Sequence, residues 1–456
     1  MKYREETDSM GTVRVPEDAL YGAHTGRAAQ HYSISGLTLP KIFIKAIARL
    51  KTAAARVNLE LEQIPEQEGK AIIRAARDIM DGRFDTQFML DVFQTGSGTS
   101  TNMNVNEVIA TRANEILTGK RLTTRPVHPN DHVNRCQSTN DVIPSAIHMS
   151  AMELMHRNLI PAMLRLETEL NARADEFANI EKIGRTHLQD AVAMTLGQEF
   201  SGYAEQMRLS RNRLYGVKER LCRLALGGTA VGTGINAHPE FAQKVIALIS
   251  EDTGFPFYEA ENHFEAQGAC DTAVETSGML KTIAVSISRI ANDIRWLASG
   301  PRCGLGEIRL PALLPGSSIM PGKVNPVICE AAIQACAHVI GNDASITHAG
   351  RGGYFELNLM LPLTAFKLTE SLQILAGAAD SMAEKCVSGI EADAEKCREN
   401  VKKSLAVVTG LVPYIGYEKA ARLAARASET GETIEDVAAR ENIMDRAELR
   451  KALYRK

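Results

Sequence analysis

Evenly spaced apolar residues over long stretches most strongly constrain how this 456-residue chain folds. Across 280–297 leucine and isoleucine recur every three or four residues, and similar series cover 152–177, 196–224 and 368–382. Spacings of three and four place side chains on one face of a helix. A fifth stretch, 327–340, is rich in alanine and cysteine and also has helical character. Several such helices predict a long bundle with seams near 3.5 residues per turn.

Length and composition predict a mainly α protein of three domains. A chain of 456 residues is too long for one ordinary core. The single tryptophan and few aromatic residues fit aliphatic helix packing. We predict a mixed, mostly helical domain over 1–140, a central long-helix bundle over 141–390 and a small helical domain over 391–456. Shorter helical patterns in the two terminal domains cover 41–62, 66–80, 391–408, 417–430, 433–440 and 445–454.

Charge and cysteine content argue against several classes of partner. A net charge of -3 gives no electrostatic case for binding nucleic acid or an anionic membrane. The chain has no apolar run of about 18 residues, and its first six residues lack the apolar region of a signal peptide. The eight cysteines form no CxxC pair, which argues against a zinc site and for reduced thiols. We therefore predict a cytoplasmic protein without metal, nucleic-acid or membrane partners.

The segment 316–326, Gly-Ser-Ser-Ile-Met-Pro-Gly-Lys-Val-Asn-Pro, is the main candidate for a functional loop. Glycine permits tight bends and proline stiffens them. Such a loop can place a hydroxyl beside a cation, and a hydroxyl acts as a base only where its anion is stabilised. A surface turn would be the better interpretation of a shorter motif, but eleven specified residues indicate a site.

This loop resembles the signature of the fumarase/aspartase superfamily, whose members break a C–N or C–O bond and release fumarate. Three other segments look like the family's substrate-site segments, in the same order: 94–99, 137–141 and 184–190. The resemblance extends over nearly the whole chain, from 7–11 to 415–417. It implies a homotetramer with a shared core of long helices, each active site at a junction of three chains, and no required cofactor.

The resemblance also implies roles for individual residues. Elimination beside a carboxylate needs a base, stabilisation of the aci-carboxylate (a dianionic enolate) and help for the leaving group. Ser317 matches the base, and Lys323 and Asn325 match residues that bind a substrate carboxylate. His187 and Glu330 match a pair that orients or protonates the leaving side. The other residues that the resemblance places at the substrate are Ser97, Thr99, Ser138, Thr139, Asn140, Thr186 and Ser318.

Three polar segments have a structural alternative. His128, Asn130 and Asp131 resemble a second, peripheral anion-binding segment of fumarases, and a turn that caps the following segment is the alternative. The Asn-Asp pair at 140–141 precedes a helical pattern and can cap it while binding substrate. The glycine-rich run 227–234 lacks the GK[ST] ending of a phosphate-binding loop, so a flexible turn between helices is the better interpretation.

Two reactions fit these residues: L-malate to fumarate and water, or L-aspartate to fumarate and ammonia. Ammonia leaves without an added proton, whereas hydroxide must be protonated as it departs. A hydratase therefore depends more on the acid pair His187–Glu330, which is present here. Segments 295–304, 128–131 and 263–266 look like those of class II fumarases, and so do 94–99 and 355–358.

Other segments favour aspartate ammonia-lyase. Ser138-Thr139-Asn140 resembles aspartases, because fumarases usually have Ser-Ser-Asn there, and the extra methyl of Thr139 would reshape the pocket. Segments 21–25 and 190–192 also resemble aspartases, whereas 351–354 departs from both patterns and leaves room for a lyase acting on a substituted succinate. We predict a fumarate hydratase working by anti elimination through an aci-carboxylate, with aspartate ammonia-lyase as the alternative. The retained site residues argue against a non-catalytic structural protein.

Overall fold

The computed structural model describes residues 2–454, which fold mainly into helices. In this part of the chain the sheets are all two-stranded, and no helix is both long and apolar enough to cross a membrane. The mainly α fold class is thus confirmed. Two compact units are present, each made from three segments: 1–160, 212–282 and 337–375 form unit 1, and 161–211, 283–336 and 376–456 form unit 2. The division into three domains stays a prediction.

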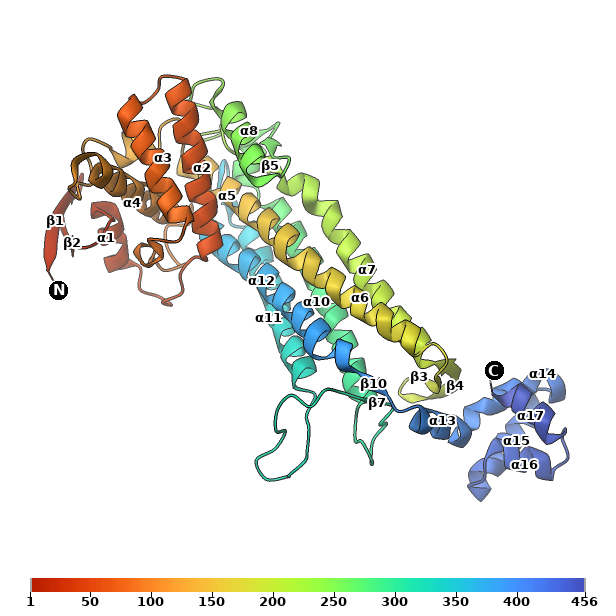
Figure 1. Ribbon diagram of the computed structural model, residues 1–456. Coiled ribbons are helices and arrows are strands. Elements are labelled where there is room, and N and C mark those ends of the chain that lie inside the picture. The colour runs from red at the N-terminus through yellow and green to blue at the C-terminus, as the bar shows by residue number, and fades with distance from the viewer. Residues whose placement is uncertain (1, 455–456) are drawn as a thin grey trace. The chain divides into compact units, whose positions relative to one another are not determined.

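Unit 1 is organised around α2 (Lys41–Glu60), as Figure 1 shows. This helix packs against α3 (Glu66–Met80), α5 (Thr139–Leu154) and α8 (Phe241–Thr253), while α3 also packs against α4 (Thr99–Thr118). Their facing side chains are mostly aliphatic residues and alanines that are fully buried. The two helices expected at 41–62 and 66–80 are therefore confirmed.

The remaining elements of unit 1 are short. The N-terminal hairpin pairs its strands antiparallel, whereas β5 and β6 pair parallel and β8 and β9 antiparallel. Their bounds are β1 (Tyr3–Asp8), β2 (Gly11–Pro16), α1 (Ala23–His31), η1 (Asp85–Gln87), η2 (Pro129–Val133), β5 (Arg223–Leu224), β6 (Tyr258–Glu259), α9 (His263–Gly268), β8 (Gly353–Tyr354) and β9 (Leu357–Asn358).

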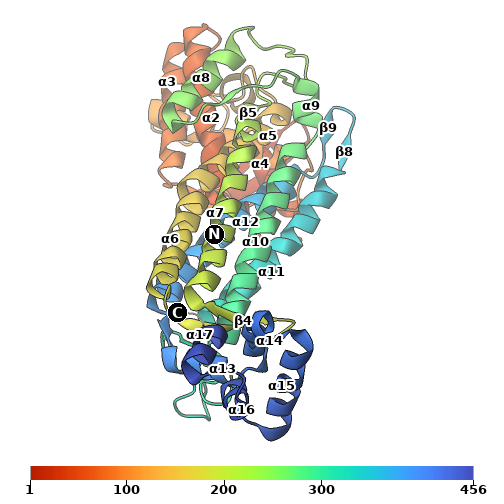
Figure 2. The ribbon, with the colours of Figure 1, turned by 90° about the vertical axis from the view of Figure 1, so that its right-hand side faces the viewer.

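The predicted apolar seams lie on long helices. The seam at 280–297 falls within α10 (Asp271–Leu297), and its leucines and isoleucines are buried. Within unit 2, segments of these helices run alongside one another (Figure 2); Tyr203 on one helix, for example, donates a hydrogen bond to Asp293 on another at 3.3 Å. The short element η3 (Met155–Leu159) continues α5 into the long helix α6 (Ile160–Glu176). The other long helices are α7 (Leu196–Leu221), α11 (Val327–Gly350) and α12 (Leu361–Lys385).

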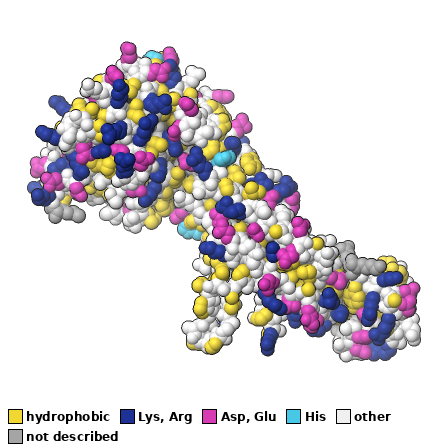
Figure 3. Space-filling view, in the orientation of Figure 1, with side chains coloured by type: hydrophobic (Ala, Val, Ile, Leu, Met, Phe, Trp, Pro, Cys, Tyr) yellow, Lys and Arg dark blue, Asp and Glu magenta, His cyan; other side chains and the backbone are white. Residues whose placement is uncertain are grey.

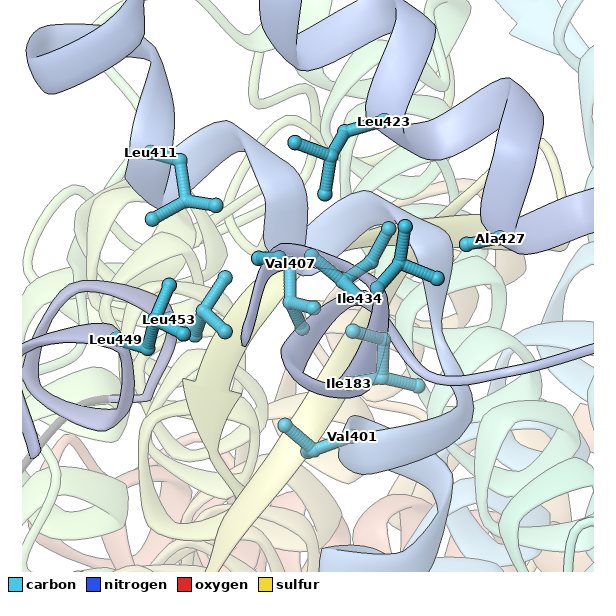
Figure 4. Close-up of a cluster of buried hydrophobic side chains, with 11 residues drawn as sticks. Ile183, Val401, Val407, Leu411, Leu423, Ala427, Ile434, Leu449 and Leu453 are labelled. Carbon is cyan, nitrogen blue, oxygen red and sulfur yellow. The ribbon is translucent and has the colours of Figure 1, made fainter. Parts of the chain in front are cut away.

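The C-terminal helices of unit 2 share a core with a strand. Val407, Leu411, Leu423 and Leu449 pack together with Ile183 of β3 (Figure 4). This cluster joins helices near the C-terminus to a hairpin more than two hundred residues earlier. The other elements of unit 2, inside and outside this cluster, are β3 (Glu181–Thr186), β4 (Gln189–Thr195), β7 (Ile308–Arg309), η4 (Val387–Gly389), β10 (Glu391–Ala392), α13 (Ala394–Lys403), η5 (Leu405–Leu411), α14 (Val412–Ile415), α15 (Tyr417–Thr430), α16 (Ile434–Arg440) and α17 (Arg446–Leu453).

The C-terminal stretch 391–408 does not form one continuous helix. The stretch 391–408 begins as the strand β10, is α-helical only over α13, and ends in the 3-10 helix η5. The helix ends at Ser404, whose extended backbone and side-chain hydroxyl cap the following turn η5 instead. Serine favours such caps because its hydroxyl competes for backbone N–H groups. The patterns at 417–430, 433–440 and 445–454 do form helices, within about two residues of their predicted bounds.

Candidate active site

The predicted functional loop projects from the helices of unit 2, between β7 and α11 (Figure 1). Its neck is closed where Asn325 Nδ2 donates a hydrogen bond to the carbonyl oxygen of Gly316 at 2.6 Å. A Cβ atom on Gly316 would lie only 2.1 Å from the carbonyl oxygen of Lys323, so this position requires glycine. The glycine and the asparagine of the motif therefore give the loop its shape.

Ser317 lies just inside this neck, and its hydroxyl oxygen accepts two backbone hydrogen bonds. The donors are the N–H groups of Ile319, at 3.2 Å, and Met320, at 3.0 Å. Two N–H dipoles aimed at one oxygen favour its anionic form. A serine that acts as a base needs such stabilisation, so this geometry is compatible with the predicted role of Ser317, which stays a prediction.

The base of the loop borders a cavity of about 610 Å³ in unit 2. Lys323, Asn325 and Glu330 line it together with Trp296 and Arg309. Three predicted site residues thus meet at one cavity. The exposed Ser318 lies on the outer part of the loop.

Hydrophobic side chains gather on the projecting loop, as the space-filling view shows (Figure 3). Ile319 is 82% exposed and Leu314 is 60% exposed, and Met320 and Val324 are also open to solvent. Apolar side chains gathered on one loop typically mark a surface that another molecule covers. The loop therefore has the character of a contact surface as well as of a site.

Thr186 and His187 lie at the tip of the β3–β4 hairpin. The strands pair up to Thr186 and Gln189, which leaves His187 and Leu188 as a two-residue turn. Both turn residues have positive φ, 58° and 59°, as the tightest hairpin turns require. Because neither is glycine, each costs roughly 1–2 kcal/mol, and such strain is typical of functional turns. The turn holds the imidazole out in solvent.

His187 and Glu330 are not in contact within one chain. No hydrogen bond or ion pair joins them in the described residues, although both belong to unit 2. The backbone N–H of Glu330 donates to the carbonyl oxygen of Pro326 in the first turn of α11. The predicted pair between His187 and Glu330 therefore stays a prediction.

A buried carboxylate anchors the hairpin. Glu307 accepts bidentate hydrogen bonds from Arg185 at 2.6 and 3.0 Å and a third from Asn400 Nδ2 at 3.1 Å. Lys182 lies 3.5 Å from the same carboxylate. Burial by itself raises the pKa of Glu307, but the hydrogen bonds from Arg185 and the charge of Lys182 outweigh it and hold that pKa below its usual value.

We expect this carboxylate to make the protein sensitive to acid. A lowered pKa in the folded state stabilises the fold above the unfolded pKa, about 4.5, and the stabilisation is lost as pH falls through the folded pKa. Glu307→Gln should therefore lower the free energy of unfolding at pH 7 by about 3 kcal/mol. Denaturant titrations at pH 7 and below pH 4 test this, because the difference between variant and parent should shrink in acid. An unchanged difference would contradict the assignment.

Unit 1 holds the predicted small donors in two groups, the first at the start of α4. Ser97 and Thr99 share a hydrogen bond of 2.8 Å between their hydroxyls. Gly98 between them has φ of +83° and ends the preceding loop. A Cβ on Gly96 would lie 2.0 Å from the carbonyl oxygen of Leu359, so a residue with a side chain does not fit at this position. The two hydroxyls thus lie beside a helix N-terminus, which favours a bound anion.

The second group forms the N-terminus of α5. Ser138 caps the helix in a capping box with Asp141, which accepts from the Ser138 N–H at 2.9 Å. Asn140 Nδ2 donates to the carbonyl oxygen of Ala230 at 2.8 Å. The helix is capped here, but by Ser138 and not by the Asn140–Asp141 pair as predicted; Asp141 lies inside the helix and is the partner of Ser138 in the capping box. Thr139 turns its hydroxyl inward, where it accepts from Asn102 Nδ2 at 3.0 Å.

The glycine-rich run 227–234 is fixed to this helix rather than flexible. The other oxygen of the Asp141 carboxylate accepts hydrogen bonds from the N–H groups of Gly227 at 3.1 Å and Thr229 at 2.9 Å. The run lies between α7 and α8, after the two-residue strand β5. The expected turn between helices is therefore present, and a buried carboxylate holds its backbone.

The segment at 128–131 caps its own turn. His128 Nδ1 accepts from the N–H groups of Asn130 and Asp131, both at 3.2 Å, and Asp131 also lies 3.4 Å from that nitrogen. The capping alternative is thus observed. His128 and Asn130 also line a cavity of about 480 Å³ in unit 1, so an anion site at these residues stays a prediction.

Sequence reasoning missed Lys51, in the middle of α2. Its side chain is completely buried, and its ammonium donates hydrogen bonds to Asn134 and Gln137, next to the Ser138 cap. The available signal was a lysine on the apolar face of a helix, between Ala48 and Ala55 at helical spacing.

Comparison with known proteins shows the family of the chain. A family model described as lyase matches residues 11–341, and a second, described as fumarase C C-terminus, matches residues 407–454. The chain belongs to the fumarase/aspartase superfamily. Within that superfamily it is 51% identical to a class II fumarate hydratase of Neisseria meningitidis, over 96% of this chain and 95% of the relative. It is also 49% identical to the mitochondrial fumarate hydratase 1 of Arabidopsis thaliana, over 96% and 89%.

Solved structures of the superfamily have the same fold. A class II fumarase from Schistosoma mansoni aligns with a TM-score of 0.95 at 38% identity, covering 99% of this chain and 98% of that one. A fumarate lyase:delta crystallin from Brucella melitensis, bound to cobalt, aligns equally well at 45% identity over 99% and 98%. The fold of this superfamily member is thus shown over almost all of its length.

Proposed function

We propose that this chain is a fumarate hydratase that interconverts L-malate with fumarate and water. The observation that carries the proposal is the near-full-length identity, 47–51%, to proteins named fumarate hydratase. Aspartate ammonia-lyase, suggested by Ser138-Thr139-Asn140, is not favoured, since the relatives at this level of identity are hydratases. Thr139 is compatible with this, because its hydroxyl is turned toward Asn102.

The proposed reaction divides the work among the site residues. Ser317, held by two N–H donors, removes the proton from the carbon beside the carboxylate, and the electron pair left behind forms the aci-carboxylate. Lys323 and Asn325 stabilise that dianion electrostatically. The carbon–oxygen bond then breaks as His187, oriented by Glu330, protonates the departing hydroxyl, so that water leaves.

The small donors of unit 1 bind the dicarboxylate. Ser97 and Thr99 lie at one helix N-terminus, and Ser138 and Asn140 lie at another. Short hydroxyl and amide side chains hold carboxylate oxygens at little cost in rotamer entropy. Thr139, Thr186 and Ser318 complete the proposed set of substrate contacts.

We further propose that the working enzyme is a homotetramer with sites shared between chains. His187 at an exposed hairpin tip and the exposed apolar loop around Ile319 both need a partner surface. A second copy of the same chain can supply that surface, and most soluble oligomers are made of identical chains. A cytoplasmic location also stays a prediction.

An absorbance assay tests the proposed reaction. Purified protein with L-malate, and no added cofactor, should produce the ultraviolet absorbance of fumarate, while L-aspartate should give no rise. The reverse reaction should consume fumarate without ammonium. A rise with L-aspartate alone would overturn the proposal in favour of the ammonia-lyase.

A further inference from the structure

Lys51 is a charged side chain that the proposed reaction does not use. It is fully buried in the middle of α2. Another completely buried lysine, Lys182, lies between two carboxylates, Glu199 at 2.8 Å and Glu307 at 3.5 Å. The hydrogen-bond partners of Lys51 are instead two amide oxygens. Burial lowers the pKa of Lys51 to about 7, and the charge of Asp141 opposes that shift.

The partners of Lys51 lie directly beside the substrate-binding turn. Its Nζ donates to Asn134 Oδ1 at 2.7 Å and to Gln137 Oε1 at 2.9 Å. Asn134 Nδ2 in turn donates to the carbonyl oxygen of Gln137 at 3.2 Å. Gln137 precedes Ser138, the cap of α5, so the ammonium fixes the chain one residue before the turn.

A second branch of the network reaches Thr139. Asn102 Nδ2 lies 3.3 Å from Asn134 Oδ1 and 3.0 Å from Thr139 Oγ1. It is therefore shared between the oxygen that Lys51 holds and a hydroxyl of the proposed site. Both branches start at the same ammonium and end at consecutive residues, Ser138 and Thr139.

We infer that Lys51 is a positioning residue for dicarboxylate binding: its ammonium holds Asn134 and Gln137, and through them and Asn102 sets the turn 138–140. This inference rests on the proposed function, because that turn is taken to bind a dianion.

The chemistry of the network supports a role in binding rather than in packing alone. Burying an ammonium without a carboxylate partner is costly, and an apolar side chain of similar volume often serves the fold equally well. The cation is useful where a dianion binds beside it, since buried charges interact strongly over short distances. A positioned cation acts on bound substrate and transition state alike, so its removal should appear mainly in KM.

Neutral substitutions test the inference. In Lys51→Met and Lys51→Gln, KM for L-malate should rise about tenfold, as expected for loss of a charge-assisted contact, while kcat changes less. Succinate, a dicarboxylate that cannot react, should bind about tenfold more weakly by calorimetry. Lys51→Arg keeps the charge and should recover much of the lost affinity. Lys70→Met is the matched control, because Lys70 is an exposed lysine of unit 1 and its loss should change neither constant.

The outcomes separate this inference from the proposed function. An unmodified enzyme that neither turns over L-malate nor binds succinate would overturn both. If the enzyme is active and its neutral Lys51 variants keep KM and succinate affinity within about twofold of the parent, the role of Lys51 alone is overturned. The same holds if kcat and melting temperature fall together in the neutral variants and Lys51→Arg does not restore them. Should the neutral variants not fold, Asn102→Ala and Gln137→Leu break the same network further out. Normal KM in both would equally refute the inference.

Discussion

Ser317→Ala is expected to lower kcat for L-malate by about 10²–10⁴-fold, the contribution of a positioned general base. The reason lies in the hydrogen bonds of the loop. The Ser317 oxygen accepts from two backbone N–H groups, which stabilise its anion, and alanine removes that oxygen altogether. The other hydroxyl of the loop, Ser318, is exposed on its outer part, and the N–H groups of Ile319 and Met320 are aimed at Ser317 instead.

The loop should keep its shape in this variant. Its neck is closed by Asn325 and Gly316, which do not involve the Ser317 side chain. The N–H groups of Ile319 and Met320 lose their acceptor but lie on an exposed loop, where water can replace it. Melting temperature and succinate affinity should therefore stay close to those of the parent.

The measurement is initial-rate kinetics on L-malate, with Ser388→Ala as the matched control. Ser388 is an exposed serine of unit 2 that bonds to the Glu384 carbonyl oxygen, and its loss should leave kcat unchanged. If Ser317→Ala keeps more than about a tenth of the parental kcat, serine is not the base, because a general base contributes at least about 10²-fold.

The helical part of the fold follows from local patterns. The helix expected at 66–80 occurs as Glu66–Met80, and the one expected at 417–430 as Tyr417–Thr430. Helix spacing is visible within a short window, because residues three and four apart share a face. The long seams were predictable for the same reason, since each seam lies on one helix.

Contacts between distant segments were not predictable in this way. The hairpin at 181–195 carries its turn on His187 and Leu188; histidine is only an occasional residue at positive φ and leucine a rare one, so the pair does not announce the turn. Its anchor joins Arg185 to Glu307, 122 residues away. Lys51 reaches Asn134 and Gln137 over more than eighty positions. Such pairs depend on tertiary packing, which single-sequence periodicity does not contain.

In the candidate site, too, residues close in the sequence were predictable and contacts between distant residues were not. Ser317 and Asn325 belong to one local motif, so the sequence could place them on one loop, and the structure does so. His187 and Glu330 were paired by resemblance, and one chain does not bring them into contact. Local sequence can propose the members of a site, whereas their meeting depends on tertiary packing and, in the proposed tetramer, on how copies of the chain associate.

Two inactive variants are therefore expected to restore activity when they are combined. His187→Asn removes the proposed acid and Ser317→Ala the proposed base, so each homotetramer should be nearly inactive. If the two residues of one site come from different chains, a mixed tetramer contains sites with both intact. Random one-to-one mixing should give about a quarter of the parental number of such sites.

Co-expression with two different affinity tags, followed by sequential purification, isolates tetramers that contain both chains. Their activity on L-malate is then compared with each variant alone and with a mixture made after purification, in which no exchange has occurred. Recovered activity in the co-expressed form alone would mean that His187 and Ser317 act across a subunit boundary. If the mixed tetramers stay inactive, each site takes both residues from one chain. The exposed hairpin tip would then have to close onto the loop of its own chain, which would require movement of a turn held by the buried Arg185–Glu307 pair.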